Sequence, residues 1–274
     1  MKILLIDTCG ATGSIALANT VRSPALVACA SLPGRSAAER LVPAIRALAT
    51  DSAINLNQLD AVAVVHGPGS FTGVRVGLSA AKGLCHALNL PLVAISRLTV
   101  LASLAAHPLA GVPPSSQGVP HSSQFVGDEW VVRALLDAGR GEFYSGLYAD
   151  GTCLRETLLT RDQLLAEVSF AEANLAEQRS EEAQLIVCEP AVAQSLGAPS
   201  KLRLGGNATP QLVAEPSAAD ALPLALARIQ QRAFDDPASI DANYLRRTDV
   251  EIFAKPAAAA VPQPRPSHPG PLSR

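Results

Sequence analysis

The sequence predicts an α/β protein built from two lobes of similar architecture, and three observations lead to this prediction. Short apolar runs typical of buried strands alternate with longer segments whose apolar residues recur at helical spacing. Three strands, a helix, a strand, a helix, a strand and a helix are expected over residues 1–106, and this order recurs in outline over residues 129–252. Between the two, residues 107–128 are rich in Pro, Ser and Gly, which indicates an insert or linker.

The first lobe is expected to begin with its central strand. Residues 2–6 form a continuous apolar run, as in a strand that is buried on both faces. A helix is expected over residues 36–50, because Leu41, Ile45 and Leu48 share one helical face. The other expected strands are residues 14–18, 26–30, 61–65 and 92–95, and the other expected helices are residues 72–88 and 98–106.

The second lobe follows the same plan. Thr160 is expected to cap a helix, with Gln163 in the capping-box position. The expected strands are residues 130–136, 143–148, 153–159, 185–188 and 202–204, with a short helix after Pro190 and a long one over residues 217–234. That long helix could pack back on the first lobe. Residues 253–274 are rich in Ala and Pro and are expected to be a disordered tail, because they have little to bury.

Two halves with one order of elements describe the duplicated architecture of actin-like and sugar-kinase-like proteins. No residue-level repeat accompanies the repeated order. The predicted fold class is therefore a two-lobed, ribonuclease H-like α/β fold.

The composition argues against two classes of function. A net charge of -2 and 4% aromatic residues do not give the basic, base-stacking surface of an independent RNA-binding module. The apolar run at the start ends at Asp7, which is too short for a membrane span. The five cysteines have no CxxC spacing, so we expect reduced thiols in a cytoplasmic protein.

The most informative segment is residues 66–84, where a strand runs through a Gly-Pro-Gly turn into a helix. Gly67 and Gly69 permit backbone angles that other residues resist, and Ser70 is a good N-cap residue. The free N–H groups of the first helical turn could hold an anion. The segment is not a P-loop, because Gly73 is followed by Val74 rather than by Lys and a hydroxyl residue. A purely structural turn and a phosphate contact both remain open.

The helix that follows carries a stripe of small residues. Gly73, Gly77 and Ala80 fall on one side of it, and Gly83 adds a third glycine. Glycine within a helix costs roughly 1 kcal/mol relative to Ala, so a compensating close approach of another backbone is expected. That backbone could be the protein's own sheet or the helix of a partner.

These residues resemble a known family. Gly67-Pro68-Gly69-Ser70-Phe71-Thr72-Gly73-Val74-Arg75, followed by Ala80-Ala81-Lys82-Gly83-Leu84, is similar to the hallmark of the TsaB (YeaZ) family. Ile6-Asp7-Thr8, Ile95-Ser96 and Tyr244-Leu245-Arg246 agree with that family as well. The resemblance covers residues 1–106 well and residues 129–252 loosely.

The resemblance implies a two-lobed actin-like fold that performs no chemistry itself. It implies a partner or scaffold subunit for TsaD, the transferase that places a threonylcarbamoyl group on the adenosine beside the anticodon of tRNA, with the ATPase TsaE joining the pair. It further implies a homodimer through the N-terminal lobe, a cytoplasmic location, contact with tRNA only through the complex, and no membrane. No cofactor of its own is implied, although the complex could hold ATP or ADP with Mg²⁺.

By the same resemblance, the helices at residues 36–50 and 72–88 would form the partner surface. The residues expected on it are Glu39, Arg40, Val42, Pro43, Arg46, Phe71, Thr72, Arg75, Val76, Gly77, Ser79, Ala80 and Gly83. No catalytic residue and no metal ligand is assigned. If this chain touches a nucleotide, the expected residues are Asp7, Thr8, Gly69 and Ser70.

Two departures from the family pattern stand out. Ala37 occupies the place where the family often has a His shortly before Leu-Leu-Pro. In the turn at residues 137–142, Gly139 precedes Arg140, so the Arg comes one place later than in the family.

The same residues allow catalytic alternatives. An actin-like ATPase or small-molecule kinase needs two facing phosphate turns, for which residues 7–13 and 137–142 are the candidates, with residues 204–208 as an adenosine-side turn. Asp7 and Asp137 could pair across a cleft and bind Mg²⁺ through water, or each could hold its own turn, as Asp commonly does. A metallopeptidase is excluded by histidine spacing, since no two of His66, His86, His107, His121 and His268 lie four residues apart.

Overall fold

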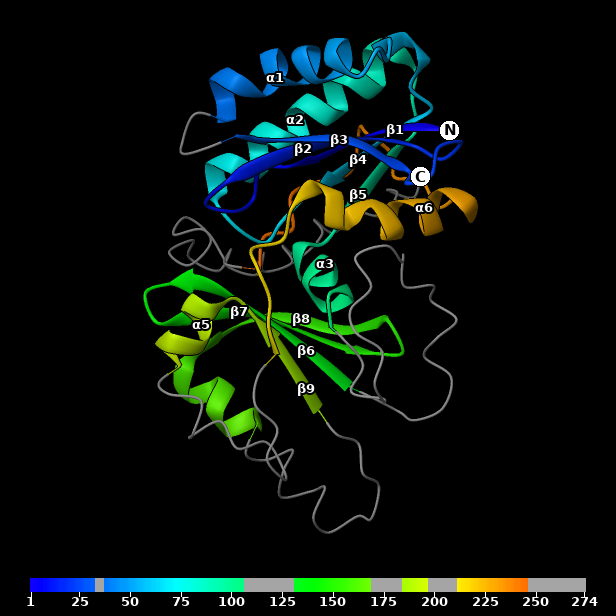
Figure 1. Ribbon diagram of the computed structural model, residues 1–274. Helices are drawn as coiled ribbons and strands as arrows, with labels where there is room; N and C mark the ends of the chain where they lie inside the picture. The colour runs from blue at the N-terminus through cyan, green and yellow to red at the C-terminus, as the bar shows by residue number, and fades with distance from the viewer. Residues whose placement is uncertain (33–36, 106–130, 169–183, 197–210, 246–274) are drawn as a thin grey trace, which may run out of the picture.

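The computed structural model contains two mixed five-stranded sheets, one in each lobe (Figure 1). It describes residues 1–32, 37–105, 131–168, 184–196 and 211–245. The predicted insert at 107–128, the strand at 202–204, the turn at 204–208 and the tail at 253–274 lie outside these ranges. The lobe boundaries that depend on the insert therefore stay predictions.

The first sheet has the order β3-β2-β1-β4-β5. The first three strands form an antiparallel meander, and β4 and β5 then extend the sheet in parallel with β1. The elements of this lobe are β1 (Lys2–Asp7), β2 (Gly13–Asn19), β3 (Leu26–Leu32), α1 (Ala37–Asp51), η2 (Leu56–Gln58), β4 (Ala61–Val65), α2 (Phe71–Leu88), β5 (Leu92–Ile95) and α3 (Arg97–Ser103).

The second sheet repeats this plan with the order β10-β9-β6-β7-β8. Here β6, β7 and β8 form the meander, and β9 and β10 are parallel to β6. Its strands are β6 (Val131–Gly139), β7 (Glu142–Ala149), β8 (Thr152–Thr160), β9 (Gln184–Cys188) and β10 (Gln211–Leu212), with α5 (Pro190–Ser195) after β9. The identical strand order confirms the predicted duplicated, actin-like architecture.

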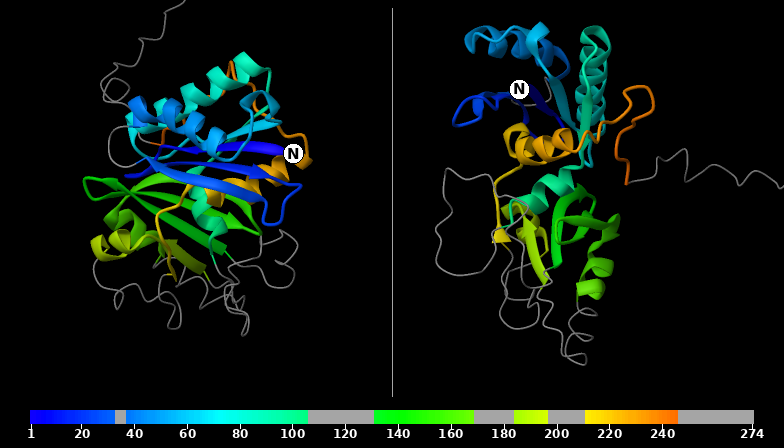
Figure 2. Two further views of the ribbon diagram at one scale, coloured as in Figure 1. Left: turned by 45° about the horizontal axis from the view of Figure 1, so that its top comes forward. Right: turned by 90° about the vertical axis from the view of Figure 1, so that its right-hand side faces the viewer.

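The central strand β1 is buried on both faces in the core of the first lobe. The four side chains from Ile3 to Ile6 have no exposed surface, because helices cover both faces of the sheet. Helices α1 and α2 pack on one face, and η3 (Ala218–Ala221) with α6 (Leu222–Gln230) packs on the other (Figures 1 and 2). The second-lobe segment therefore packs back on the first lobe, as predicted.

Two helices expected in the second lobe differ in their outcome. The single long helix over residues 217–234 is wrong: a short 3₁₀ turn precedes α6, which ends at Gln230. Arg232 has a φ of 55°, a left-handed conformation that a helix cannot continue through. The capping box at Thr160 is confirmed, because Gln163 N donates to Thr160 Oγ1 at 3.3 Å and Thr160 N donates to Gln163 Oε1 at 2.9 Å. Residues 161–168 are helical.

Helix α2 lies against the protein's own β1 through its glycines. A Cβ on Gly73 would overlap the carbonyl oxygen of Thr8, and a Cβ on Gly77 would overlap the Thr8 hydroxyl. Gly77 is buried. The prediction that Gly77 faces a partner is therefore corrected. The close approach that Gly77 permits is to Thr8 of the same chain, directly after β1.

Helix α3 lies between the two lobes (Figure 1). It follows β5 of the first sheet and packs on β6 and β7 of the second. Leu98 and Leu101 are fully buried there, in a cluster that includes Ala134 and Tyr148 of the second lobe. Among the described residues, no helix has the length and apolarity needed to cross a bilayer.

The glycines of α2 give a test of this packing. Gly73→Ala is expected to lower the free energy of unfolding by about 1–3 kcal/mol, because the new methyl group must displace backbone at Thr8. Gly83→Ala, in the same helix, meets nothing within 4 Å and should raise stability by roughly 0.5–1 kcal/mol through helix propensity alone. Urea denaturation of both variants measures the contrast. Equal effects at the two positions would contradict the packing described.

Candidate functional site

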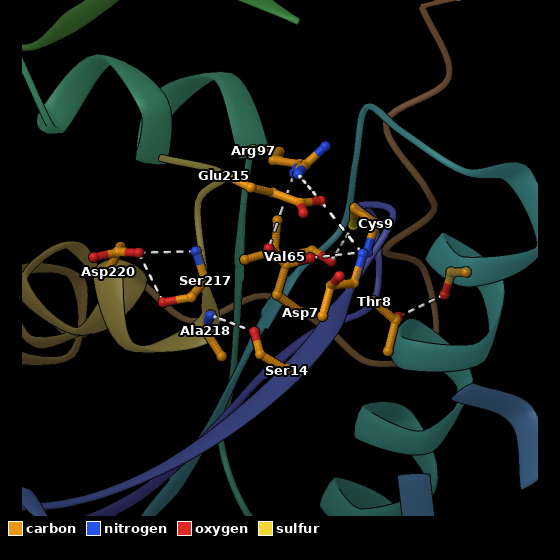
Figure 3. A network of polar contacts seen from close by, with 12 residues as sticks. Asp7, Thr8, Cys9, Ser14, Val65, Arg97, Glu215, Ser217, Ala218 and Asp220 are labelled. Atoms are coloured by element: carbon orange, nitrogen blue, oxygen red, sulfur yellow. Dashed lines mark hydrogen bonds and ion pairs between the residues drawn. The ribbon is translucent and has the colours of Figure 1, made fainter. Parts of the chain in front are cut away.

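The turn after β1 lies at the carboxyl ends of the parallel strands β1 and β4, where open α/β sheets usually place their ligands. Its own hydrogen bonds hold it in shape (Figure 3). Asp7 Oδ1 accepts from Cys9 N at 2.8 Å, and Cys9 Sγ donates to Val65 O at 3.1 Å. Thr8 Oγ1 donates to Gly73 O at 2.6 Å, which ties the turn to α2.

The Gly-Pro-Gly segment before α2 is built against this same turn. Ser70 N donates to Cys9 O at 2.8 Å, and the Ser70 hydroxyl caps α2 by accepting from Gly73 N at 3.3 Å. Gly67 has a φ of 112°, which glycine alone adopts readily. A Cβ on Gly69 would overlap the carbonyl oxygen of Cys9. One glycine is thus required for its backbone angle and the other for clearance.

The structure brings the four residues predicted for nucleotide contact to one place. The side chains of Asp7, Thr8 and Ser70 all make hydrogen bonds within the chain, and Gly69 gives room for the neighbouring carbonyl. The Ser70 N-cap prediction is confirmed. A role in nucleotide binding stays a prediction for all four.

Arg97, the first residue of α3, is buried beside the turn and lies among carboxylates that are buried or half-buried (Figure 3). Its Nη2 is 3.0 Å from Glu215 Oε1 and 3.8 Å from Glu189 Oε1, and its Nε is 4.0 Å from Asp7 Oδ2. The Arg97 side chain is 7% exposed. Sequence reasoning missed this residue, because a single Arg that begins a short helix carries no pattern.

Glu215 contacts the turn from the segment that follows β10 of the second sheet. It lies in the connection between β10 and η3, far from the turn in sequence, and its Oε1 accepts from Ala11 N at 2.7 Å. The connection is fixed just beyond it, since Ser217 and Asp220 form a capping box and Ala218 N donates to Ser14 Oγ at 2.8 Å.

The electrostatic balance of this group is acidic. Burial raises the pKa of Asp7, and the Arg97 guanidinium opposes that rise. Burial also raises the pKa of Glu189; Arg97 opposes this shift, while Glu215 and Asp137 add to it. Burial raises the pKa of the Cys9 thiol well above its ordinary value, which disfavours the reactive thiolate. One guanidinium therefore faces three carboxylates, those of Asp7, Glu189 and Glu215.

Asp137, the other carboxylate considered for a cleft pair, holds its own turn. Its Oδ1 accepts from Gly139 N at 2.7 Å. Gly139, Arg140 and Gly141 all have positive φ, so the hairpin between β6 and β7 is a tight turn of left-handed residues. Asp7 and Asp137 thus each bond to their own turn, and the alternative in which they bind Mg²⁺ through water stays a prediction.

A second polar contact links the lobes through Glu156 of β8. Its Oε1 accepts from Ser96 Oγ at 2.5 Å and from Tyr148 OH at 2.7 Å. Its Oε2 accepts from Asn243 Nδ2 at 2.6 Å. Ser96 caps α3, so this network fixes the helix that carries Arg97 to the second sheet.

The predicted partner surface on α1 and α2 is largely exposed. Exposed side chains are found at Glu39, Arg40, Val42, Pro43, Arg46, Phe71, Thr72, Arg75, Ser79 and Gly83. Val76 and Ala80 are half-buried, and Gly77 is buried as described above. At one end of this surface, Arg75 lies 3.6 Å from the centre of the Phe71 ring, and its Nε donates to Tyr244 OH at 2.7 Å.

The raised pKa of Glu189 predicts a pH effect. A carboxyl whose pKa is higher in the folded state than its ordinary 4.5 binds its proton more tightly when folded, so stability falls as pH rises past that value. Glu189→Gln is neutral throughout. Its free energy of unfolding should therefore rise relative to that of the wild type as pH increases from about 4 to about 7. Urea denaturation at several pH values tests this, and a difference that stays constant or reverses would contradict it.

Comparison with known proteins gives matches over part of the chain. The family model described as "TsaD: tRNA N6-adenosine threonylcarbamoyltransferase" matches residues 31–119. The tRNA threonylcarbamoyladenosine biosynthesis protein TsaB of Haemophilus influenzae is 38% identical over 115 residues, which are 41% of this chain and 48% of that protein. The Bacillus subtilis protein of the same name is 33% identical over 149 residues, or 54% of this chain and 55% of that one. The chain thus spans about half the length of the curated relatives it matches.

Solved structures agree on the fold. YeaZ from Pseudomonas aeruginosa superposes with a TM-score of 0.61 at 23% identity, covering 89% of this chain and 99% of that one. A second structure, titled as an uncharacterized protein with similarity to peptidase YEAZ from Pseudomonas aeruginosa, gives a TM-score of 0.64 at 24% identity, with the same coverage. Over about half of its length this chain is similar to curated TsaB proteins, and it shares the fold of the solved YeaZ structure.

Proposed function

We propose that this chain is a non-catalytic partner subunit in the formation of threonylcarbamoyladenosine in tRNA. In this role it binds and supports a TsaD-type transferase together with a TsaE-type ATPase. The curated relatives named as biosynthesis proteins for this modification support the pathway. The match of residues 31–119 to the transferase family model supports a subunit that shares the transferase's fold.

One observation carries the proposal: the groups that could do chemistry face inward, and an adaptable surface faces outward. The Asp7 carboxylate is 1% exposed and is bound to its own turn and to Arg97. In contrast, Val42 of α1 is 53% exposed and Phe71 of α2 is 49% exposed. Exposed apolar and aromatic groups on neighbouring helices are typical of protein interfaces.

The aromatic cluster at the start of α2 would anchor this interface. Phe71 and Tyr244 lie with ring centres 5.7 Å apart, and Arg75 stacks over the Phe71 ring. Aromatic and Arg side chains supply much of the binding energy at protein interfaces, because they bury large areas at a low cost in rotamer entropy. The cluster is already ordered within one chain, which reduces that cost further.

Several finer points belong to the same proposal. The chain holds no cofactor of its own, and ATP or ADP with Mg²⁺ is held in the complex. It contacts tRNA only through its partners and acts in the cytoplasm. In the absence of a partner, the same face of α1 and α2 forms a homodimer.

The interface is tested at Ser79, an exposed residue in the middle of α2. Ser79→Arg places a long charged side chain on the proposed surface and should abolish co-purification with the TsaD-type transferase of the same organism. Its melting temperature should stay near that of the wild type, because the position is exposed. Leu154→Arg, at a 57% exposed position of β8 in the second lobe, is the matched control and should still co-purify.

Retained co-purification of Ser79→Arg would place the partner elsewhere. Light scattering of the same variants without partner gives the oligomeric state, and a dimer that persists in Ser79→Arg would contradict the shared face.

The non-catalytic role is tested by ATP turnover. The purified chain alone should show no sustained hydrolysis, because the Asp7 carboxylate is buried and already paired. Addition of the two partner subunits should produce turnover that depends on the complex. Sustained hydrolysis by the chain alone would instead favour an actin-like ATPase or small-molecule kinase.

A further inference from the structure

We propose that the Glu215 carboxylate is a built-in anion: it occupies an oxyanion site formed by the turn after β1 and Arg97, and it keeps phosphate out. The fold class implies a nucleotide phosphate at this turn. The residues present do not fit one while Glu215 is in place. Removing Glu215 is inferred to leave a site for a small oxyanion such as inorganic phosphate.

The first support is the set of donors. Glu215 Oε1 accepts from the backbone N–H of Ala11 at 2.7 Å and lies 3.5 Å from the N–H of Thr12. The same oxygen accepts from Arg97 Nη2 at 3.0 Å. Backbone N–H groups of a turn and a guanidinium are the donors that proteins use for phosphate oxygens. A carboxylate oxygen satisfies the same donors with the same sign of charge.

The second support is Arg97 itself. It is 6% exposed, and its Nε is a buried donor with no hydrogen-bond partner among the described residues. A buried donor left unpaired is costly. The Asp7 carboxylate oxygen Oδ2 is 4.0 Å from this Nε, too far for a hydrogen bond. The guanidinium therefore retains capacity for an acceptor beyond the single oxygen of Glu215.

The third support is the filled space and the charge around it. A Cβ on Gly10 would overlap both Glu215 Oε1 and Arg97 Nη2, so side chains already fill the region above the turn. Asp7 and Glu189 lie near the same guanidinium. A phosphate brought beside three carboxylates and one Arg would meet net repulsion. Loss of the Glu215 side chain removes the steric obstacle, and it lowers the electrostatic one by taking away the carboxylate nearest to the Arg97 guanidinium.

The position of Glu215 also explains how it stays there. Val213 N donates to Cys188 O at 3.0 Å in the second lobe, and the Ser217 capping box packs on the first. The connection crosses from one lobe to the other between these two points (Figure 1). The carboxylate thus holds the lobes together as well as filling the site.

The experiment compares Glu215→Ala with Glu167→Ala in sodium phosphate and in sodium chloride of equal ionic strength. Glu167 accepts from the buried Arg133 at 3.1 Å within the second lobe, so its loss also strips a carboxylate from a buried Arg. Both variants should melt about 5 °C below the wild type in chloride. Phosphate should restore a few degrees to Glu215→Ala alone, beyond the general stabilisation by phosphate that the wild type and Glu167→Ala report.

Equal responses of the two variants would overturn the proposal, and so would a wild type that gains as much from phosphate as Glu215→Ala. If Glu215→Ala does not fold in chloride, recovery of cooperative unfolding in phosphate carries the same meaning as the restored melting temperature. Glu215→Ser, which leaves a hydroxyl on the connection, provides an independent variant. Phosphate titration calorimetry on it should detect heat that the wild type lacks, and absence of that heat would count against the site.

Discussion

The ion pairing of Arg97 is the interaction on which the relation between the lobes depends. A buried guanidinium must find partners, because leaving it unpaired in an apolar interior is expensive. Its partners come from three separate segments: Asp7 ends β1, Glu189 precedes α5, and Glu215 lies between β10 and η3. The first lobe, the second lobe and the connection that returns to the first are therefore joined at one charge. The Glu156 network holds Ser96, the N-cap of the same helix. Both contacts between the lobes therefore involve the start of α3.

This pairing changes the meaning of the turn after β1. In an enzyme of this fold the turn would offer its N–H groups to a ligand, but here a side chain of the same molecule takes that place. The glycine-rich segment before α2 is also explained without a ligand, since Gly69 and Gly73 make room for the backbone of Cys9 and Thr8. The motif thus encodes a close contact between a strand, a turn and a helix. The polar groups of the motif that the structure describes are bonded within the chain, whereas several side chains on the outer face of α2 are exposed.

Local patterns predicted most of the fold, and long-range contacts account for what they missed. The continuous apolar run of β1, the helical spacing of α2 and the hydroxyl of Ser70 each act within a few residues, so the sequence predicts them directly. The pairing of Arg97 with Glu215 spans 118 residues and depends on two lobes meeting, which no window of sequence contains. The prediction of one long helix over 217–234 was wrong, because apolar residues recur past Gln230 although the helix ends there. The backbone at Arg232 is left-handed, which the apolar spacing does not reveal.

Gly77 shows why the sequence alone did not identify the neighbour of the small residues on α2. A stripe of small residues indicates close approach, but the period alone cannot say whether the neighbour is internal or a partner. The structure assigns the inner neighbour, since Gly77 faces Thr8, whereas Gly83, six residues later, meets nothing within 4 Å. A helical glycine that allows no close contact within its own chain lowers helix stability, and no packing in that chain compensates for the loss. Such a residue on an exposed face, beside Ser79, is what a surface requires if a second backbone is to approach α2 from outside. Gly77 therefore serves the packing of α2 within the chain, whereas the exposed Gly83 fits the partner surface that we propose.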